Sequence, residues 1–429
     1  MIIKEKRKGE RRVTRNVLFR TVLVILSIAV FAAFLRQALS EHYAQDISTL
    51  DERKISRASE IADEDAQYHF LWGLLHYAGR DKPGLEKSVH HYLISLRRNP
   101  TDSRVWVALA RAYRDQGMAQ YADYAIRKTL YFDKNNPSLI WEAGIFFLTQ
   151  NKTADAIQAL RRYIYMMPGE QENVYSLCHM MGVTPMAMLD SLLPQDYNFY
   201  KRFLNFLMSN KLYSDSSEVW KRLKKFNPER SEYLKYCNHL IEAGELDEAR
   251  AIWDEFAKKF FSGENKLSDD MVWNGDFEMP VEDGGFDWRI GASEGVRVFR
   301  DKDIRWSGFA SLRVSFNGKT NPGLYMARQI VPVTPGQKYR LAGYMRTEKI
   351  TTLNGVVIEA SNYLCDPFVK KTEPATGTNL WKKLELEFTA PQKCRTVSIG
   401  IKRERSDKVE NKISGDAWID SLTMIPARN

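Results

Sequence analysis

The sequence predicts a multidomain α plus β protein: an N-terminal transmembrane helix, an α-helical solenoid over 65–263 and an antiparallel β-sandwich over 264–429. Three observations support this prediction. An apolar stretch from Val17 to Leu35 follows a basic N-terminus. A small/large pattern recurs every 34 residues in the middle of the chain. Beyond it, helical spacing gives way to short alternating runs. Residues 41–64 are expected to form a linker.

The positive charge belongs to the N-terminus. Residues 1–20 carry eight basic side chains against two acidic ones, Glu5 and Glu10, so their net charge is +6. The formal charge of the whole chain is +9, which leaves only +3 for the other 409 residues. The basic balance therefore gives no support to nucleic-acid binding.

The apolar segment is most simply an uncleaved anchor within residues 1–40. Its uncharged core from Thr21 to Leu35 makes about 22 Å of helix, against about 30 Å of bilayer. Arg20 and Arg36 flank this core and can extend the span by reaching the headgroups. The basic side stays in the cytoplasm, so the rest of the chain is expected outside it.

The alternative for this segment is a cleaved signal peptide. Ala38 and Ser40 have the small-x-small spacing of a cleavage site. Against cleavage, the apolar core ends at Leu35 and Arg36 interrupts the approach to that site. The uncleaved anchor is therefore preferred.

The solenoid is predicted from four copies of one pattern with intervals of 3, 9 and 4 residues. The copies are Ala110-Tyr113-Ala122-Ile126, Gly144-Phe147-Ala156-Leu160, Leu204-Leu207-Ser216-Trp220 and Cys237-Leu240-Ala249-Trp253. The small residues let two antiparallel helices approach closely, and the large ones fill the space between them. Pro168 and Pro228 stand where a helix must stop. The period and pattern resemble a tetratricopeptide array, which implies a concave face that binds a protein partner.

Two parts of the solenoid fit the repeat poorly. A first, degenerate unit is expected around Trp72 and Gly73, with an insertion at 81–84 and a second helix through 92–96. Residues 169–194 suggest an irregular helical pair. Its methionines are interpreted as filling an irregular core, with an adaptable binding surface as the alternative. They are Met180, Met181, Met186 and Met188.

The histidines and cysteines predict no metal motif. No HExxH or CxxC accompanies them, so the seven histidines are interpreted as solvated. Cys178 and Cys237 fall at core positions and are expected to be buried thiols. Cys365 and Cys394 share the C-terminal domain, and a disulfide between them is left open because sequence does not give their separation.

The C-terminal region is predicted to be a sandwich of eight to ten short strands. Turn residues bound each alternating run. The runs are 310–316, 323–331, 338–346, 355–359, 381–389, 396–402 and 417–424.

Four motifs in order across 273–425 resemble the jelly-roll carbohydrate-binding modules of families four and nine, within the galactose-binding-like superfamily. They are the opening Asn274-Gly275-Asp276-Phe277-Glu278, the turn from Val333 to Tyr339, the strand beginning at Trp381 with Leu384, Phe388, Ala390 and Pro391, and the ending from Ala417 to Leu422. No cofactor is otherwise required, but the resemblance implies a structural calcium at Glu278 and Asp420, with Asp276. The alternative is that these carboxylates accept hydrogen bonds without a metal.

The resemblance also implies sugar binding by an exposed aromatic ring with polar side chains beside it. The candidates are Trp288, Trp306, Tyr325, Tyr344 and Tyr363, with Gln329 and Arg346. Trp288 and Trp306 are favoured, because alternation buries half of the aromatic residues that lie in strands.

Over 65–425 the order of segments resembles membrane-anchored tetratricopeptide-repeat proteins of bacterial exopolysaccharide or O-antigen loci. That resemblance implies a single-pass protein of the bacterial inner membrane, with its bulk in the periplasm. It also implies a non-catalytic scaffold for a polysaccharide polymerase, ligase or export component, whose sandwich contacts glycan. The second hypothesis is a general envelope assembly factor, for pili or secretion, whose sandwich binds protein only. The third is a glycan-active enzyme, for which no GxSxG or Rossmann motif is present.

Overall fold

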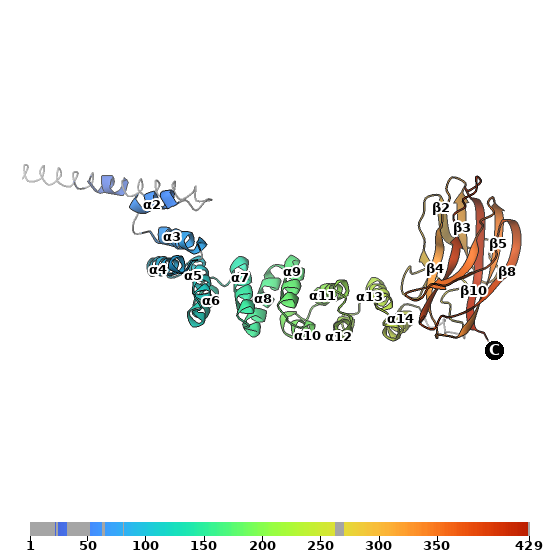
Figure 1. Cartoon of the computed structure of the whole chain (residues 1–429), viewed down its shortest axis with the longest axis horizontal. Helices are drawn as coiled ribbons and strands as arrows, with labels where there is room; N and C mark the ends of the chain where they lie inside the picture. Colours follow the sequence, from blue (N-terminus) through green and yellow to red (C-terminus); the bar gives the residue numbers. More distant parts are fainter. Residues whose placement is uncertain are drawn as a thin grey trace, which may run out of the picture. The chain divides into compact units, whose positions relative to one another are not determined.

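The computed structural model describes Val22 and residues 25–31, 52–61, 65–79, 81–261 and 270–427. The chain divides into two compact units, Met1–Phe206 and Leu207–Asn429, which are described separately (Figure 1). The helices are α2 Glu52–Ile61, α3 Ala66–Ala78, α4 Lys82–Arg98, α5 Ser103–Asp115, α6 Ala119–Phe132, α7 Pro137–Thr149, α8 Thr153–Met166, α9 Gln171–Met180, α10 Pro185–Ala187, α11 Tyr197–Ser209, α12 Tyr213–Lys224, α13 Arg230–Ala243 and α14 Leu246–Phe260. The strands are β1 Arg289–Ile290, β2 Val296–Asp301, β3 Ser311–Asn317, β4 Leu324–Pro332, β5 Lys338–Ile350, β6 Val357–Asn362, β7 Val369–Lys371, β8 Gly377–Thr389, β9 Thr396–Arg403 and β10 Ser414–Pro426.

Most of the predicted anchor lies outside the described residues. Its described part, Val22 and residues 25–31, is helical, with exposed apolar side chains. Within the described ranges, no helix has both the length and the apolar character needed to span a membrane.

Within the predicted linker 41–64 lies helix α2. Its Ile55 is fully buried and clusters with Tyr68 and Leu71 of α3. This buried side chain places one face of α2 against α3.

Helices α3 and α4 form the degenerate first pair. Gly73 lies against the ring of Tyr92, which leaves no space for a Cβ atom. The predicted insertion at 81–84 is the beginning of α4: the Asp81 carboxylate accepts the backbone N–H of Gly84 at 3.0 Å. This N-cap satisfies a donor that the first helical turn leaves without an internal partner.

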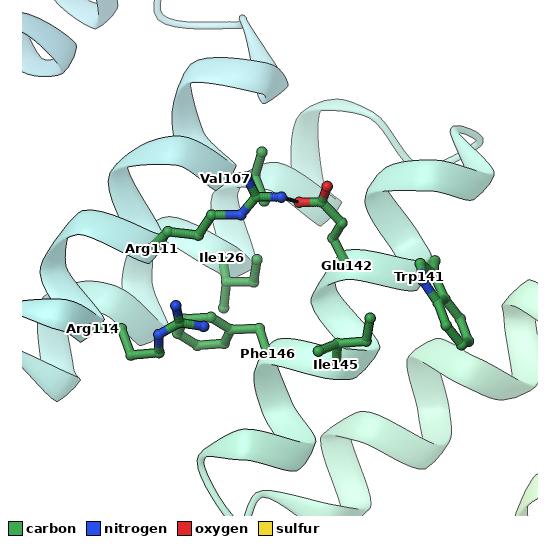
Figure 2. A pocket seen from close by; sticks show the side chains of 8 residues that line it. All are labelled: Val107, Arg111, Arg114, Ile126, Trp141, Glu142, Ile145 and Phe146. Atoms are coloured by element: carbon green, nitrogen blue, oxygen red, sulfur yellow. Dashed lines mark ion pairs between the residues drawn. The ribbon is translucent and has the colours of Figure 1, made fainter. Parts of the chain in front are cut away.

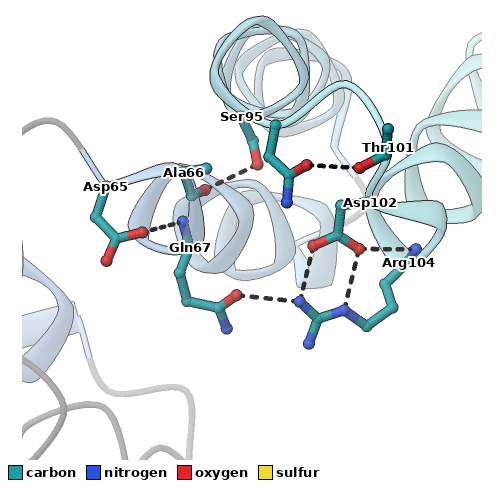
Figure 3. A network of polar contacts seen from close by, with 8 residues as sticks. Asp65, Ala66, Gln67, Ser95, Thr101, Asp102 and Arg104 are labelled. Atoms are coloured by element: carbon teal, nitrogen blue, oxygen red, sulfur yellow. Dashed lines mark hydrogen bonds and ion pairs between the residues drawn. The ribbon is translucent and has the colours of Figure 1, made fainter.

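Polar contacts join helices α3, α4 and α5 (Figure 3). Ser95 of α4 donates its hydroxyl to the carbonyl of Ala66 at 2.8 Å. Asp102 caps α5 and holds the guanidinium of Arg104, which also donates to Gln67 of α3 at 3.4 Å. The first pair is therefore tied to the next one by side chains as well as by apolar packing.

The repeat pattern is confirmed by the helix pairs α5–α6, α7–α8 and α13–α14. In the first pair Ala110, Ala122 and Ile126 are fully buried. In the second, a Cβ on Gly144 would lie 2.6 Å from the Leu160 side chain, so a larger residue would separate the helices. The small positions therefore set the helix spacing, as the sequence predicts.

The irregular segment is also confirmed. After α8 a 3₁₀ turn (Pro168–Glu170) leads into α9, and α10 continues into a π-helical turn, Met188–Leu192. Met188 is buried, whereas Met180 and Met181 are exposed. The interpretation of the methionines as core therefore holds for Met188 and not for these two.

The second unit contains a sandwich of two five-stranded antiparallel sheets. One sheet has the order β1-β4-β9-β6-β7 and the other β2-β3-β10-β5-β8. Their inner faces enclose one core that includes Phe277, Trp288, Leu341, Ile399 and Ile419. All seven predicted strands are present, and among the described residues β1, β2 and β7 complete the ten.

The last two helices pack against the sandwich within this unit. Trp253 of α14 contacts Trp273 and Phe286, with ring centroids 5.2 and 6.2 Å apart. Asn238 of α13 accepts the backbone N–H of Gly285 at 2.7 Å. Gly285 has φ +59° and lies against the Trp253 ring, so only glycine suits this position.

A disulfide joins Cys365 and Cys394, whose Cα atoms are 5.2 Å apart. It connects the loop after β6 to the loop before β9. The pairing that the sequence left open is therefore present. Cys178 and Cys237 are free and buried, as predicted.

Candidate functional site

The outer face of the β2-β3-β10-β5-β8 sheet carries a row of alternating aromatic and arginine side chains. Phe299 lies opposite Arg313, Arg313 opposite Trp418, and Trp418 opposite Arg346. Trp381 lies at the register shift where β8 passes Arg346. Each strand contributes one residue, so the row crosses the sheet over four strand spacings, roughly 19 Å. We call these five residues the cation–π row.

Four side chains of the row, all except Trp381, contact one another in sequence across the sheet. The Arg313 guanidinium lies 5.5 Å from the ring centroid of Phe299 and 4.9 Å from that of Trp418. The Arg346 guanidinium lies 5.5 Å from the Trp418 ring on its other side. Cation–π contacts of this kind contribute about 0.5–2 kcal/mol each, so they hold the row together.

Two carboxylates fix the middle of the row. Arg313 forms ion pairs with Asp301 at 3.2 Å and with Asp416 at 3.0 Å, and the Trp418 indole N–H donates to Asp301 at 2.9 Å. Burial opposes the charge on Asp301, but hydrogen bonds from Trp418, the backbone and Arg313 keep the pKa of this carboxyl below its ordinary value. Arg313 is thus neutralised within the fold.

Next to the row lies an exposed stack of aromatic rings. Trp306, from the loop between β2 and β3, stacks on Tyr344 of β5 with centroids 4.2 Å apart and planes 13° apart. Trp381 is tilted against it at 6.3 Å. Trp306 remains 46% exposed. We call Trp306, Tyr344 and Trp381 the aromatic platform.

The carboxylate of Asp420 holds the loop that carries Trp306. Its Oδ2 atom accepts the backbone N–H groups of Trp306 at 2.8 Å and of Ser307 at 3.1 Å. Asp420 is fully buried, so these bonds form away from water. They fix the position of the indole ring on Tyr344.

Glu278 holds the other end of the same loop. Its Oε1 atom accepts the N–H groups of Phe309 at 2.7 Å and of Ala310 at 3.3 Å. The third residue of the implied metal site, Asp276, accepts the N–H of Glu278 at 3.4 Å. These predicted ligands therefore use their oxygens on backbone donors.

The carboxylates implied as calcium ligands are engaged by backbone N–H groups in this structure, and calcium binding stays a prediction. The loop already contains a cation, because the Arg305 guanidinium donates to the carbonyls of Lys302 at 2.6 Å and Gly308 at 2.9 Å. Nowhere in the described ranges do three or more metal-ligating side chains gather. The bonding of Glu278 and Asp420 matches the metal-free alternative.

Two of the predicted sugar-binding residues are parts of the core, which corrects that prediction. Trp288 is 0% exposed, packs against Phe277 and donates its indole N–H to the Asn274 carbonyl at 3.0 Å. Gln329 is also buried and exchanges two hydrogen bonds with the backbone of Trp273. Neither side chain reaches a ligand at the surface, because Trp288 packs inside the core and Gln329 is covered by the segment before Asn274.

Tyr325 lies on the opposite sheet, away from the aromatic platform. Its hydroxyl contacts Glu359 and Ser361, and Lys402 donates to Glu359 at 2.9 Å. Burial, followed by the hydrogen bond to Glu359, raises the pKa of Tyr325 to about 12. Tyr363 follows β6 of this same sheet, so the sheet order brings together only Trp306, Tyr344 and Arg346 of the predicted sugar-binding residues.

Sequence patterns do not single out Trp381, Arg313 or Phe299 on this face, nor the buried Trp418 that supports the two arginines. Trp381 and Trp418 were used only as markers of the fold. Alternation places Arg313, Trp381 and Trp418 on outer strand positions, whereas Phe299 lies in β2, whose pattern does not indicate a strand with a buried face. Their alignment in one row depends on the strand order, which pairs Arg313 with Trp418, 105 positions later in the sequence (418 − 313).

The first unit contains a second candidate site, a pocket of about 240 Å³ on the helical repeats (Figure 2). Arg111 of α5 forms an ion pair with Glu142 of α7 across it. Arg114 lies 6.0 Å above the Phe146 ring. The pocket is lined by Val107, Arg111, Arg114, Ile126, Trp141, Glu142, Ile145 and Phe146. It lies between the first helices of two consecutive pairs, α5 and α7, with Ile126 of α6.

Four of the seven histidines gather on α3 and α4, where the sequence analysis expected scattered, solvated side chains. The Nδ1 atoms of His69 and His91 are 3.1 Å apart, and His76 and His90 lie within 5.7 Å of His91 by ring centroids. Burial, reinforced by these neighbours, lowers the pKa of His91 to about 4. The pairing of the two helices creates this cluster.

Comparison with known proteins gives short or weak likenesses. No family model matches the chain. Over 103 residues it is 26% identical to the human general transcription factor 3C polypeptide 3, covering 24% of this chain and 12% of that protein. The chain thus spans about an eighth of the length of this curated relative.

Solved structures similar to parts of the chain include both expected kinds of domain. A CBM4 structure is 14% identical and covers 36% of this chain and 99% of its own, with a TM-score of 0.28. The tetratricopeptide protein YrrB, described with an unusual peptide-binding site, is 12% identical. The match covers 50% of this chain and 95% of YrrB, with a TM-score of 0.26. PilF of Pseudomonas aeruginosa is 17% identical; the match covers 47% of this chain and 94% of PilF, with a TM-score of 0.26. At these scores the fold rests on the helix pairs and sheets described above.

Proposed function

We propose that this protein is a non-catalytic, membrane-anchored scaffold of cell-surface polysaccharide assembly, and that its sandwich contacts glycan through the aromatic platform. The observation that carries this proposal is the exposed Trp306 ring stacked on Tyr344. A flat, partly exposed aromatic ring offers a face on which a pyranose can stack. Because Asp420 and Glu278 hold the loop by its backbone, this face is formed before ligand binds, which lowers the entropic cost of binding.

The helical repeats supply the scaffold part of the proposal. The pocket between α5 and α7 has apolar walls with Arg111, Arg114 and Glu142 at its rim. Such a pocket can accept an apolar side chain from an extended or helical segment of a partner. The charged groups can then bind polar side chains next to it in that segment. The proposed partner is a component of polysaccharide polymerisation, ligation or export.

The proposed location is the periplasmic side of a bacterial inner membrane. The apolar segment from Val17 to Leu35, behind the basic N-terminus, would provide the anchor. The Cys365–Cys394 disulfide supports export, because disulfides persist mainly in oxidising compartments.

The proposal is tested by binding measurements on the full-length protein. A glycan array, followed by calorimetric titration of the best ligands, would compare the wild type with Trp306→Ala. We expect saturable binding that the substitution weakens about tenfold, which corresponds to a loss of about 1.4 kcal/mol with the stacking ring. Tyr131→Ala is the matched control, because Tyr131 is an exposed aromatic residue of the helical unit.

One observation favours the second candidate, an envelope assembly factor whose sandwich binds protein only. Phe309 and Leu380, beside the aromatic platform, are 80% and 81% exposed. Exposed apolar side chains next to aromatic anchors are typical of protein interfaces. Failure of any glycan to bind the folded protein, together with a partner lost on Trp306→Ala, would favour this alternative over glycan contact.

A further inference from the structure

The two arginines of the cation–π row differ in their partners. Arg313 is paired with Asp301 and Asp416. Arg346 contacts the Trp418 ring, but none of the described carboxylates lies within ion-pair distance of it. The half-buried Arg346 therefore carries a charge that the fold does not neutralise. Its neighbour Arg313, in contrast, has two carboxylate partners.

The other charges near Arg346 are already engaged or remote. Lys383, across from Tyr344, is paired with Glu385 at 2.8 Å. Glu348, two residues along β5, lies 4.0 Å from Lys349. Asp416 is held by Arg313. The uncompensated charge at this point of the sheet is thus positive and belongs to Arg346.

Arg346 lies beside the aromatic platform. It is two residues from Tyr344 on the same face of β5, which is roughly 7 Å. Trp381 lies at the register shift next to it. A ring that stacks on Trp306 or Trp381 can therefore direct a substituent toward the guanidinium. The planar fork of an arginine matches the two oxygens of a carboxylate, with which it forms two parallel hydrogen bonds.

We propose that the glycan bound by this face is acidic, and that Arg346 binds the carboxylate of a uronic acid residue while the aromatic platform stacks on its ring. This inference rests on the proposed glycan contact and adds its chemical class. A neutral sugar would leave the half-buried guanidinium without a counter-charge, and a carboxylate removes that cost.

Two polymers with the same backbone, one acidic and one neutral, test the inference. Polygalacturonate and its methyl ester share one backbone, and full-length protein would be titrated with each. We expect the ester to bind at least tenfold more weakly. Arg346→Ala should weaken binding of the acid form by a similar factor and leave binding of the ester unchanged. Arg346→Lys should restore part of the affinity, since lysine keeps the charge and loses the fork.

Arg340→Ala is the matched control, because Arg340 is an exposed arginine on the same strand and face, six residues away. It should leave the affinity for the acid form unchanged. Equal binding of acid and ester, or an effect of Arg340→Ala equal to that of Arg346→Ala, would overturn the inference. If neither polymer binds but a neutral glycan binds in a manner that depends on Trp306, the inference fails and the proposed function stands. If no glycan binds, both fail.

Discussion

At the scale of single residues, the carboxylates of Asp420 and Glu278, implied as calcium ligands, accept hydrogen bonds from backbone N–H groups. Asp420 and Glu278 each accept two N–H groups from the loop that carries Trp306. The Arg305 guanidinium provides the positive charge in the same loop. These carboxylates therefore position the Trp306 ring, because they hold the backbone of the loop that carries it.

Asp420→Ala is expected to destabilise the sandwich by about 2–4 kcal/mol, because two N–H groups lose a buried acceptor. Urea unfolding would measure this loss. The same variant should weaken glycan binding as Trp306→Ala does. Asp276→Ala, which removes one long hydrogen bond at an exposed position, should change neither quantity. A chelator that lowers the stability of the wild type would contradict the metal-free bonding described above.

At the scale of secondary structure elements, pairing creates features that no single helix contains. The histidine cluster forms because α3 brings His69 and His76 against His90 and His91 of α4. Trp72 stacks on two of these rings. We expect the stability of the α3–α4 pair to depend on pH, because protonation of several stacked imidazoles would place like charges next to one another.

The pKa of His91 is about 4 in the folded protein and near its ordinary value of 6.5 in the unfolded chain. The unfolded chain therefore binds more protons between these values, so stability is complete above pH 6.5 and is lost as the pH falls toward 4. After allowance for the solvent exposure of His91, the expected loss is about 1–2 kcal/mol. Thermal melting at pH 7 and pH 5 would show a smaller drop for His91→Gln than for the wild type. Equal drops would refute this account.

At the scale of the whole molecule, the change from helices to strands does not separate two independent bodies. The second unit contains α12, α13 and α14 together with the sandwich. Trp253 packs against Trp273, and Asn238 bonds to both Gly285 and Arg289. The sandwich thus covers the end of the helical repeats that would otherwise expose an apolar face.

The disulfide stabilises this unit by closing a loop with a sequence separation of 29. The chain-entropy estimate for such a loop is about 3–4 kcal/mol, so the double variant Cys365→Ser/Cys394→Ser should unfold at a lower urea concentration by a corresponding amount. Dithiothreitol should lower the stability of the wild type toward that of the variant and leave the variant unchanged. A wild-type protein indifferent to reductant would show that the bond contributes little.

Much of the fold could be predicted from local patterns. Ala110, Ala122 and Gly144 reveal the helix pairs because close packing requires small residues at fixed intervals, and that requirement is written in the sequence. The strands from 310 to 424 were found by alternation in the same way. Strand β2 was missed because its alternating residues include two arginines and an aspartate, which do not resemble a buried face.

The candidate site could be predicted only in part, and the reason is the range over which its residues meet. The sequence by itself determined the order of the segments, the period of the repeats and the alternation of the strands, since each depends on neighbours within a few turns or strand steps. The tertiary structure decided that Trp288 is core and Trp306 is surface, and that Phe299, Arg313, Arg346, Trp381 and Trp418 form one row. Strand order and register join residues far apart in the chain, and no local pattern encodes them.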